Sequence, residues 1–494
     1  MRQSQNNLPC ASRFRIIRAT DAATRATDQC DCACVDTRVA AHAFDPDAAQ
    51  PHAVYHLPRD THLTPLAGDW HFAFQPRALF APVVLNDAAR DLLAQFAAPR
   101  SAQFANAEAT AAARELITTQ LLVPTERLAA PTTQVATTLT AWLHLTNACN
   151  LRCAYCYLAQ SPAAMPRTTG ERALDAVVRS AVRRAYRGVK IKFAGGEPLI
   201  DPALVWQLHD YARRITARHS LALDAVVLSN GTLLTAPIIE QLRAHNLRLM
   251  ISLDGVGAAH DAQRHFADGR GSFVQVARGI DLALARGVAP EISVTLSDRN
   301  LDDLPATMEF ILARDLPFTL NFYRENDCAG ARADLRLDDA RIIAALREAY
   351  RVVEKYLPRR SCLGSLADRA SFLAPHARTC AVGCDYLVID PRGRIAKCQM
   401  QMDASVTDVR AADPLQVVQA DRAGIQNIEV DEKVRCRDCE WKYFCAGGCP
   451  LATFRATGRY DMPSPHCAIY RAIYPQILRL EALRLIKYYA GEIS

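Results

Sequence analysis

The sequence predicts an α/β fold organised around an open, partial barrel of six β/α units. Between residues 139 and 325, short apolar segments alternate with amphipathic segments of helical length, which indicates parallel strands joined by helices. Three cysteines follow the first apolar segment, and a Gly-Gly turn follows the second. In β/α barrels the chemistry lies at the carboxyl ends of the strands, so these residues mark the expected site.

Composition limits the classes of protein to which the chain can belong. On the usual domain size, a chain of this length holds about three domains. An apolar content of 50% and a charged content of 22% are typical of soluble globular proteins. The net charge of +6 is modest and argues against nucleic acid as the main partner. No apolar run is long enough to span a bilayer, and the N-terminus lacks the apolar core of a signal peptide. We therefore expect a cytoplasmic protein with no membrane partner.

The 17 cysteines fall mainly into groups. In a reducing cytosol, clustered thiols indicate metal binding or catalysis rather than disulfides. Along an extended chain, Cys30, Cys32 and Cys34 would stand roughly 6–7 Å apart. That spacing is too wide for thiolates on one metal, so we exclude these three from the sites. Cys328 and Cys362 stand apart from the groups and are expected to be buried packing residues.

The N-terminal quarter of the chain is expected to hold two segments. Residues 1–75 are weakly patterned, whereas residues 76–128 predict a small winged-helix-like domain. Its expected elements are a strand over 82–87 and helices over 88–96 and 107–119. Such a domain could bind an extended peptide along a sheet edge, or it could be a plain packing domain. A linker rich in Thr and Ala follows over 129–137.

The barrel is expected over residues 138–330. Its strand candidates are 139–145, 189–194, 223–229, 247–253, 291–296 and 317–323. The helices between them run roughly over 170–187, 202–219, 236–245, 272–286 and 302–314. A helical connector is expected over 331–377, with its helix at 336–357, and a cysteine-rich domain ending in a helix over 378–494.

The loop after the first barrel strand carries Cys149, Cys153 and Cys156 in the spacing C-x3-C-x2-C. Three converging thiolates can hold metal, but three do not complete a tetrahedral site. On an iron–sulfur cube they would leave one iron without a protein ligand, which suits a reactive cluster. A zinc knuckle with a distant fourth ligand, or buried structural cysteines, would fit the same loop.

A glycine pair and a carboxylate follow the second barrel strand. Gly195 and Gly196 let the backbone turn tightly and approach a ligand closely. Glu197 then offers a carboxylate that suits a ligand ammonium. Taken alone, a Gly-Gly turn is also compatible with a purely structural role.

Polar residues also follow the third and fourth barrel strands. Ser229 and Asn230 could bind a ribose, or they could form an Asx turn and cap the next helix. Asp254 and Arg264 could form a structural ion pair, or they could frame a ligand and a substrate. These residues alone leave both alternatives open.

Taken together, the loop and the turn resemble the radical S-adenosylmethionine (SAM) family over residues 140–325. The resemblance lies in the three-cysteine loop, with Tyr155 before its last cysteine, and in the turn Gly-Gly-Glu-Pro at 195–198. It implies that the three cysteines hold a [4Fe-4S] cluster whose open iron takes the amino and carboxylate groups of SAM. In this family, reductive cleavage of SAM gives a 5′-deoxyadenosyl radical that abstracts a substrate hydrogen, and the protein aims that chemistry.

The resemblance also implies roles for the residues around the cofactor. Glu197 would help to hold the amino group of SAM, and Tyr155 would lie against the adenine. Ser229 and Asn230 would lie near the ribose. The expected cofactor site is completed by Gly195, Gly196 and Arg264.

Eight cysteines lie in the C-terminal region. Residues 387–395 predict a β-hairpin that brings Cys384 and Cys398 near one another. Eight thiolates make two complete sets of four, which would serve tandem zinc sites or iron–sulfur clusters equally well.

The order of these cysteines resembles the SPASM extension of radical SAM peptide-modifying enzymes. The matching pattern is C-x12-G-x4-C, then C-x2-C-x5-C-x3-C, then a last cysteine, over residues 378–470. The resemblance implies two auxiliary [4Fe-4S] clusters that act as electron relays. The first would be held by Cys380, Cys384, Cys398 and Cys449. The second would be held by Cys436, Cys439, Cys445 and Cys467.

The function that the resemblance implies is a maturase that oxidatively crosslinks a ribosomally made peptide. The N-terminal domain would bind a leader segment of that peptide, and flavodoxin or ferredoxin would donate electrons. An alternative is the sulfatase-maturating type, which oxidises Cys or Ser to formylglycine with an Asp base after the second hairpin cysteine. Here Gln399 stands there and cannot accept a proton in that way. Asp254 is our candidate base. A zinc-binding scaffold without catalysis is the alternative from another class.

Overall fold

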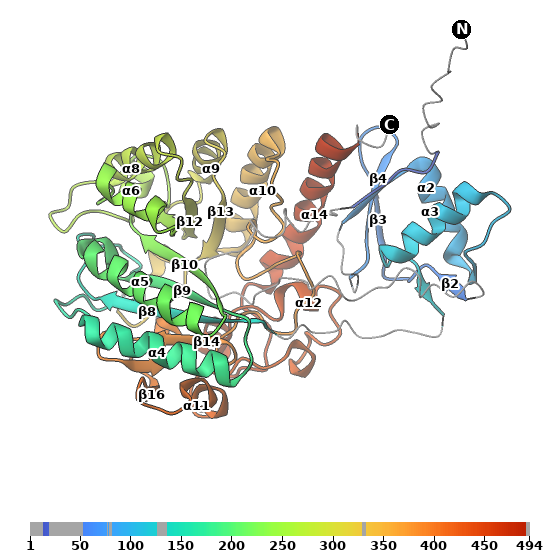
Figure 1. Ribbon diagram of the computed structural model, residues 1–494. Helices are drawn as coiled ribbons and strands as arrows, with labels where there is room; N and C mark the ends of the chain where they lie inside the picture. The colour runs from blue at the N-terminus through green and yellow to red at the C-terminus, as the bar shows by residue number, and fades with distance from the viewer. Residues whose placement is uncertain are drawn as a thin grey trace, which may run out of the picture.

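The computed structural model describes residues 13–18, 53–76, 78, 82–125, 136–328 and 332–490. A β/α barrel and an N-terminal sheet unit lie at opposite ends of the molecule (Figure 1). The C-terminal helix α14 (Cys467–Tyr489) lies between them. Among the described residues, no helix is long and apolar enough to cross a membrane.

Two small antiparallel sheets and two helices form the N-terminal unit. The first sheet has the order β1 (Ile16–Ile17), β5 (Val83–Asn86), β4 (Trp70–Phe74), β3 (His62–Pro65). The second has the order β6 (Arg100–Ser101), β2 (Val54–His56), β7 (Val123–Pro124). The expected strand and both expected helices are present, as β5, α2 (Asp87–Ala94) and α3 (Ala107–Thr118). Asn86 begins α2 by accepting a hydrogen bond from the N–H of Ala89 (3.0 Å).

The sequence did not predict the strands that precede residue 76. Strand β4 pairs with β5 across the boundary placed after residue 75. Its alternation is hidden because both faces are covered: Ala73 joins the core under α2 and α3, whereas Phe72 and Phe74 join the core shared with the C-terminal region. A strand buried on both faces reads as a plain apolar run. The expected linker over 129–137 falls mostly outside the described residues.

Six parallel strands form the barrel in sequence order, as expected. They are β8 (Thr138–Thr146), β9 (Gly188–Gly195), β10 (Ala222–Ser229), β11 (Arg248–Ser252), β12 (Glu291–Leu296) and β13 (Phe318–Phe322). The predicted α/β fold class is therefore confirmed. The outer helices are α4 (Arg167–Arg183), α5 (Pro202–Arg218), α6 (Ala236–Ala244), α7 (Ala258–Asp261), α8 (Phe273–Ala285) and α9 (Leu304–Ala313).

Alternation along the strands separates the helix-covered face from the barrel interior. On β8, Leu139, Ala141 and Leu143 belong to the main core together with residues of α4 and α5. Trp142 lies in a different cluster, with side chains of the C-terminal region. Because successive strand residues point to opposite faces, the C-terminal region packs against the inner face at β8.

The C-terminal region extends the barrel sheet at its open edge. Strand β14 (Tyr386–Ile389) pairs in parallel with β8, placing Tyr386 opposite Thr140. The predicted hairpin is confirmed by β15 (Arg394–Ala396), which pairs antiparallel with β14 and is followed by β16 (Ser405–Asp408). The remaining helices are α10 (Asp339–Tyr356), α11 (Pro414–Ala420), α12 (Lys442–Cys445) and α13 (Pro450–Thr457).

An aromatic cluster joins the N-terminal unit to the C-terminal region. The ring of Phe74 on β4 stacks on Trp441 with the centroids 5.3 Å apart, and it also contacts Phe444. Phe372 stacks on Phe444 at 4.9 Å. These buried contacts fix the two parts against one another.

Candidate functional site

The three-cysteine loop packs directly against the Gly-Gly turn. The N–H of Gly196 donates to the carbonyl of Thr146 (2.6 Å), and the N–H of Glu197 donates to the carbonyl of Ala148 (2.9 Å). A Cβ at Gly196 would stand 2.2 Å from the carbonyl oxygen of Ala148, and a Cβ at Gly195 would stand 2.5 Å from that of Thr146. Only glycine lets the two segments approach this closely. The pair therefore seats the end of β9 under the loop that follows β8.

The thiols of Cys149, Cys153 and Cys156 lie close enough to influence one another. Burial raises the pKa of each thiol, and that of Cys153 reaches about 12. The positive charge of Arg264 acts in the opposite direction on all three pKa values. The negative charge of Cys156 adds to the raised pKa values of Cys149 and Cys153. Three half-buried thiols facing a common positive charge form a donor set that fits a cluster with one open iron.

Glu197 is fully buried and is held by the end of β10. Its Oε1 accepts hydrogen bonds from the hydroxyl of Ser229 (2.9 Å) and the N–H of Leu199 (3.0 Å). Its Oε2 accepts from the N–H of Asn230 (2.7 Å). Burial raises the pKa of Glu197 to about 6, and these hydrogen bonds act in the opposite direction. The expected residues Glu197, Ser229 and Asn230 thus lie together, bridging β9 and β10.

The side chain of Asn230 links this bridge to the cysteine loop. Its amide donates to Asn150 Oδ1 (2.8 Å) and lies 3.8 Å from Cys149 Sγ. Its Oδ1 accepts from the N–H (3.0 Å) and the hydroxyl (2.7 Å) of Thr232. Asn230 therefore forms the Asx turn that the sequence allowed and also contacts the cysteine loop, whereas the N-cap of the next helix, α6, is Thr235. Its place near a ribose stays a prediction.

Tyr155, Asp254 and Arg264 form a buried polar cluster on the other side of the loop. The hydroxyl of Tyr155 donates to Asp254 Oδ2 (2.5 Å), and Arg264 donates to both partners. Asp254 Oδ1 accepts from the N–H of Thr295 (2.7 Å). Burial raises the pKa of Asp254, whereas the positive charge of Arg264 acts to lower it. Both oxygens of Asp254 are engaged, so the proposed role as a base requires these bonds to rearrange.

The structure brings seven of the eight C-terminal cysteines together in the two expected groups. Cys436, Cys439, Cys445 and Cys467, here called the second set, line one pocket of about 480 Å³. The first set expected from the sequence is Cys380, Cys384, Cys398 and Cys449, of which Cys380, Cys398 and Cys449 pack in one cluster of side chains. The pKa of Cys380 is raised to about 12, mainly by burial, and the negative charges of Cys449 and Cys398 contribute to the rise. The donor chemistry of both sets fits four-thiolate metal centres.

Arg324 connects the barrel to the first set, a contact that the sequence did not suggest. It follows β13, and its Nη2 forms an ion pair with both carboxylate oxygens of Asp368 (2.6 and 2.7 Å). The negative charge of Cys449 also contributes to the raised pKa of Arg324. Burial alone would raise the pKa of Cys449, but Arg324 and Arg369 lower it overall. A positive charge from the barrel therefore stabilises the thiolate of Cys449.

Breaking the Arg324–Asp368 pair is expected to destabilise the fold. Asp368 is 2% exposed, and removing one partner of a buried ion pair costs about 3–5 kcal/mol. We expect Arg324→Gln to lower the free energy of unfolding by this amount in chemical denaturation. Because the double variant Arg324→Gln/Asp368→Asn leaves no unpaired charge, it should recover most of the loss. A single variant as stable as the unaltered chain would contradict the prediction.

Two predictions about isolated cysteines have different outcomes. Cys362 is buried, as expected. Cys328 is exposed, so the prediction that it is a packing residue is wrong. It lies on a turn after β13, near enough to Cys156 to raise the pKa of that thiol. Cys30, Cys32 and Cys34 lie outside the described residues.

The outer helices carry a second polar group that is separate from the strand ends. On α5, His209 Nδ1 lies 3.4 Å from His245 Nδ1, which lies 3.2 Å from Asp210 Oδ1. Trp206 stacks on His245, so the group holds α5 to α6.

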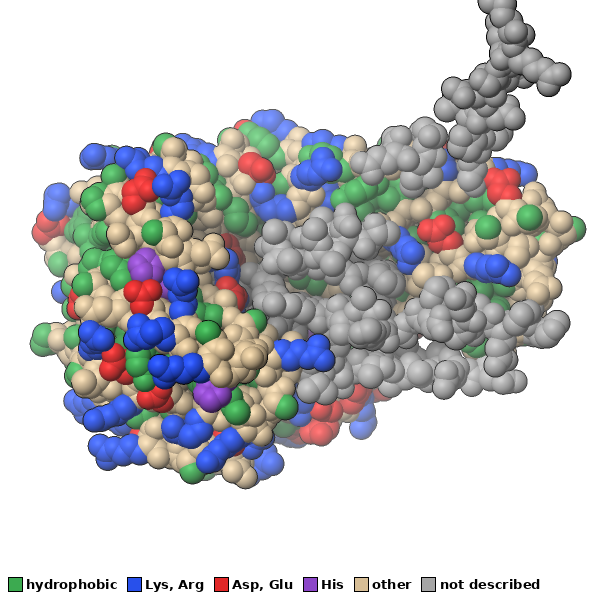
Figure 2. All heavy atoms as spheres, viewed as in Figure 1, with side chains coloured by type: hydrophobic (Ala, Val, Ile, Leu, Met, Phe, Trp, Pro, Cys, Tyr) green, Lys and Arg blue, Asp and Glu red, His purple; other side chains and the backbone are tan. Residues whose placement is uncertain are grey.

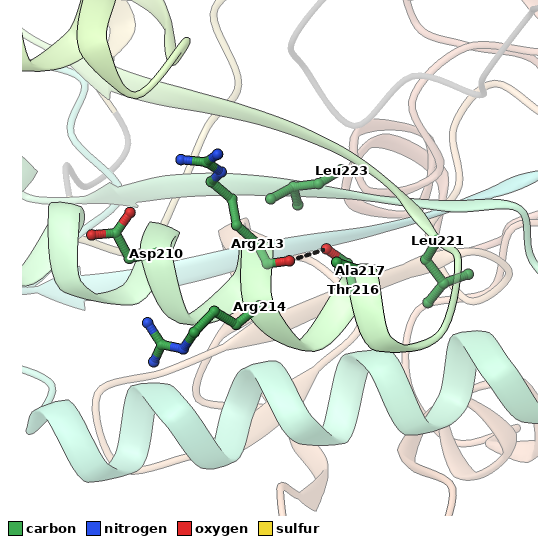
Figure 3. A pocket seen from close by; sticks show the side chains of 7 residues that line it. All are labelled: Asp210, Arg213, Arg214, Thr216, Ala217, Leu221 and Leu223. Carbon is green, nitrogen blue, oxygen red and sulfur yellow. Dashed lines mark hydrogen bonds between the residues drawn. The ribbon is translucent and has the colours of Figure 1, made fainter.

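Figure 2 shows many basic side chains over the outer face of the barrel, and exposed arginines occur on both α4 and α5. In Figure 3 the guanidinium groups of Arg213 and Arg214 point away from one another beside an open pocket.

Comparisons with known proteins agree with the geometry. The family model for the Radical SAM superfamily matches residues 143–311. The AdoMet-dependent heme synthase of Methanosarcina barkeri is 28% identical over 67% of this chain and 96% of that protein. A probable GTP 3′,8-cyclase of Methanocella arvoryzae is 31% identical over 44% of this chain and 68% of that protein. The antilisterial bacteriocin subtilosin biosynthesis protein AlbA of Bacillus subtilis is 25% identical over 53% of this chain and 54% of that protein.

The fold also has a counterpart among solved structures. Native anSMEcpe with bound AdoMet and the Cp18Cys peptide aligns with a TM-score of 0.57 and 16% identity. The alignment covers 70% of this chain and 99% of that one. The barrel topology, the thiol loop on its first strand and the sequence matches together show that the chain belongs to the radical SAM superfamily of enzymes.

Proposed function

We propose that the protein is a radical SAM maturase that oxidatively crosslinks a ribosomally made peptide. The observation that supports the proposal is the cysteine-rich C-terminal region, whose strand β14 pairs with β8 of the barrel. A net oxidation of the peptide removes two hydrogens and needs an outlet for an electron. Two clusters fully ligated by cysteine are suited to provide that outlet.

The cofactor site would be built from the loop and the strand ends described above. When bound, SAM and its cluster supply a one-electron cleavage that delivers a radical able to abstract hydrogen. Cys149, Cys153 and Cys156 would hold the cluster. Glu197 is held by Ser229 and Asn230 near the position proposed for the SAM amino group. Tyr155, fixed by Asp254 and Arg264, would line the adenine side.

A peptide substrate is supported by the relative AlbA, whose name assigns it to the biosynthesis of the bacteriocin subtilosin. The N-terminal unit also presents β3 as the edge strand of its first sheet. An edge strand can take an extended peptide by strand addition, so we propose that it binds a leader segment. Flavodoxin or ferredoxin is the proposed electron donor.

Gln399 favours crosslinking over formylglycine formation. Its Oε1 accepts a hydrogen bond from the hydroxyl of Tyr386 (3.2 Å), and the Cys398 thiol lies 4.0 Å from the same atom. An amide in this position cannot take a proton from a Cys or Ser substrate as a carboxylate could.

Metal content tests the proposed cofactors. Three four-iron clusters require about twelve iron atoms per chain. We expect anaerobically reconstituted protein to approach this iron content with equimolar acid-labile sulfide. Protein that is free of iron and holds zinc at these cysteines would contradict the enzymatic proposal and support a zinc-binding scaffold.

The substrate class is tested by reductive SAM cleavage. Reduced holoenzyme should form 5′-deoxyadenosine faster with a small peptide encoded beside the gene than without it. The relative from Methanosarcina barkeri is named a heme synthase. The same assay is therefore run with an iron porphyrin precursor in place of the peptide, as the alternative substrate. Stimulation by the porphyrin and not by the peptide would overturn the peptide proposal while leaving the radical chemistry intact.

A further inference from the structure

A buried lysine lies where the two cysteine sets meet. Lys433 is fully buried, and its carbonyl accepts a hydrogen bond from the N–H of Cys436 (3.2 Å). Its Nζ donates to the carbonyl of Ala446 (3.0 Å). Ala446 stands between Cys445 of the second set and Cys449 of the first. The ammonium of Lys433 therefore lies beside the segment 445–449, which connects a cysteine of the second set to one of the first.

The surrounding backbone is shaped around this side chain. Gly447 has a φ of +76°, and a Cβ at this position would lie 2.6 Å from Lys433 Nζ. Thr379, which precedes Cys380 of the first set, donates its hydroxyl to the carbonyls of Cys445 and Ala446 (2.9 Å each). Segments of both sets are thus tied together around the Ala446 carbonyl that Lys433 also contacts.

The ammonium of Lys433 has no carboxylate partner among the described residues. Among the described residues, no Asp or Glu oxygen lies within 4.0 Å of Lys433 Nζ, whereas Lys397 Nζ lies 2.7 Å from Asp421. Burial lowers the pKa of Lys433, and the negative charges that raise it come from cysteines of both sets: Cys436, Cys445, Cys380 and Cys449. A buried charge needs nearby compensation. The described groups that could provide it are the metal-binding thiolates.

We propose that Lys433 is a positioning residue whose ammonium, placed between the two cysteine sets, raises the reduction potentials of both auxiliary clusters. This proposal rests on the proposed function, because it needs both clusters. A four-thiolate cluster is anionic, and reduction adds one further negative charge that a nearby cation stabilises. An ammonium has three N–H donors, and the Ala446 carbonyl takes one. Removing the charge should make both clusters harder to reduce.

The test is a redox titration followed by electron paramagnetic resonance. The full chain carries Ala at Cys149, Cys153 and Cys156, so that the remaining signals come from the auxiliary clusters. Into this background we place Lys433→Met, which keeps length without charge, Lys433→Gln, which keeps a donor to Ala446, and Lys433→Arg, which keeps the charge. Lys355→Met, on an exposed lysine of α10, is the matched control. Iron content is measured for every variant.

For both neutral variants, we expect the reduced-to-oxidised ratio of both clusters to fall at least tenfold at fixed potential. That fall corresponds to about 59 mV for a one-electron couple. The cluster potentials of Lys433→Arg and Lys355→Met should stay close to those of the background protein.

Unchanged potentials with iron retained, or a shift in one cluster alone, would overturn the proposal. Loss of iron from all three Lys433 variants would show a packing role and would also overturn it. Absence of auxiliary signals from the background protein itself would overturn the proposed function, and this proposal with it.

Discussion

Replacing Cys153 by alanine is expected to abolish SAM cleavage. Of the three loop cysteines, Cys153 has its pKa raised furthest by burial and interacts with both neighbours. Two thiolates cannot retain a site-differentiated four-iron cluster, so the remaining iron should fall from about twelve to about eight atoms per chain. The rate of 5′-deoxyadenosine formation should fall by about 10⁶-fold or more, the scale of a whole enzymatic acceleration.

Cys362→Ala provides the matched control for this loss. Cys362 is buried but lies outside the three cysteine groups, so its removal should leave the iron content and the turnover unchanged. Both are measured on anaerobically reconstituted protein, by iron assay and by chromatography of the reaction mixture. Full iron content in the Cys153 variant would mean that the loop does not hold a cluster.

Gly196→Ala is expected to cause the second largest loss, through geometry alone. The new methyl carbon would stand 2.2 Å from the carbonyl oxygen of Ala148 and 2.7 Å from its carbonyl carbon. Backbone atoms cannot rotate away, so the cysteine loop and the turn must separate by about 1 Å. A misplacement of that size can reduce the rate about 10²-fold. We expect turnover to fall by this factor while cluster content is largely retained.

Gly287→Ala separates this steric effect from ordinary backbone strain. Gly287 has a φ of +74°, and an added Cβ would meet no atom of the described residues within 4 Å beyond its own chain neighbours. The substitution should therefore cost stability without slowing catalysis. Michaelis constants for SAM and first-order rates under saturating SAM distinguish the two cases. Equal rates for both glycine variants would refute the close packing described for the turn.

The sequence predicted the barrel well because its strands are short apolar segments that alternate regularly with amphipathic helices. All six strands, from β8 to β13, lie within two residues of their expected bounds. The strands before residue 76 were missed because they are short, and because β4 is buried on both faces. The pairing of β14 with β8 joins segments far apart in the chain. No local pattern could indicate it.

For the candidate site, motifs identified residues but not their partners. Glu197, Ser229 and Asn230 were expected around one cofactor, and the structure joins them by direct hydrogen bonds. The sequence left Asp254 and Arg264 as either an ion pair or a ligand frame. They are paired, with Tyr155 as a third member. Arg324 and Lys433 carried no motif, since their significance depends on burial beside cysteines from other segments.

The mass of the product peptide tests the central claim most directly. Reduced holoenzyme, SAM and the peptide encoded beside the gene are incubated without oxygen, and the peptide is analysed by high-resolution and tandem mass spectrometry. We expect a peptide lighter by two hydrogens, with no added oxygen and with two residues joined, formed together with 5′-deoxyadenosine. A product of unchanged mass, as epimerisation would give, or one carrying formylglycine, would contradict it.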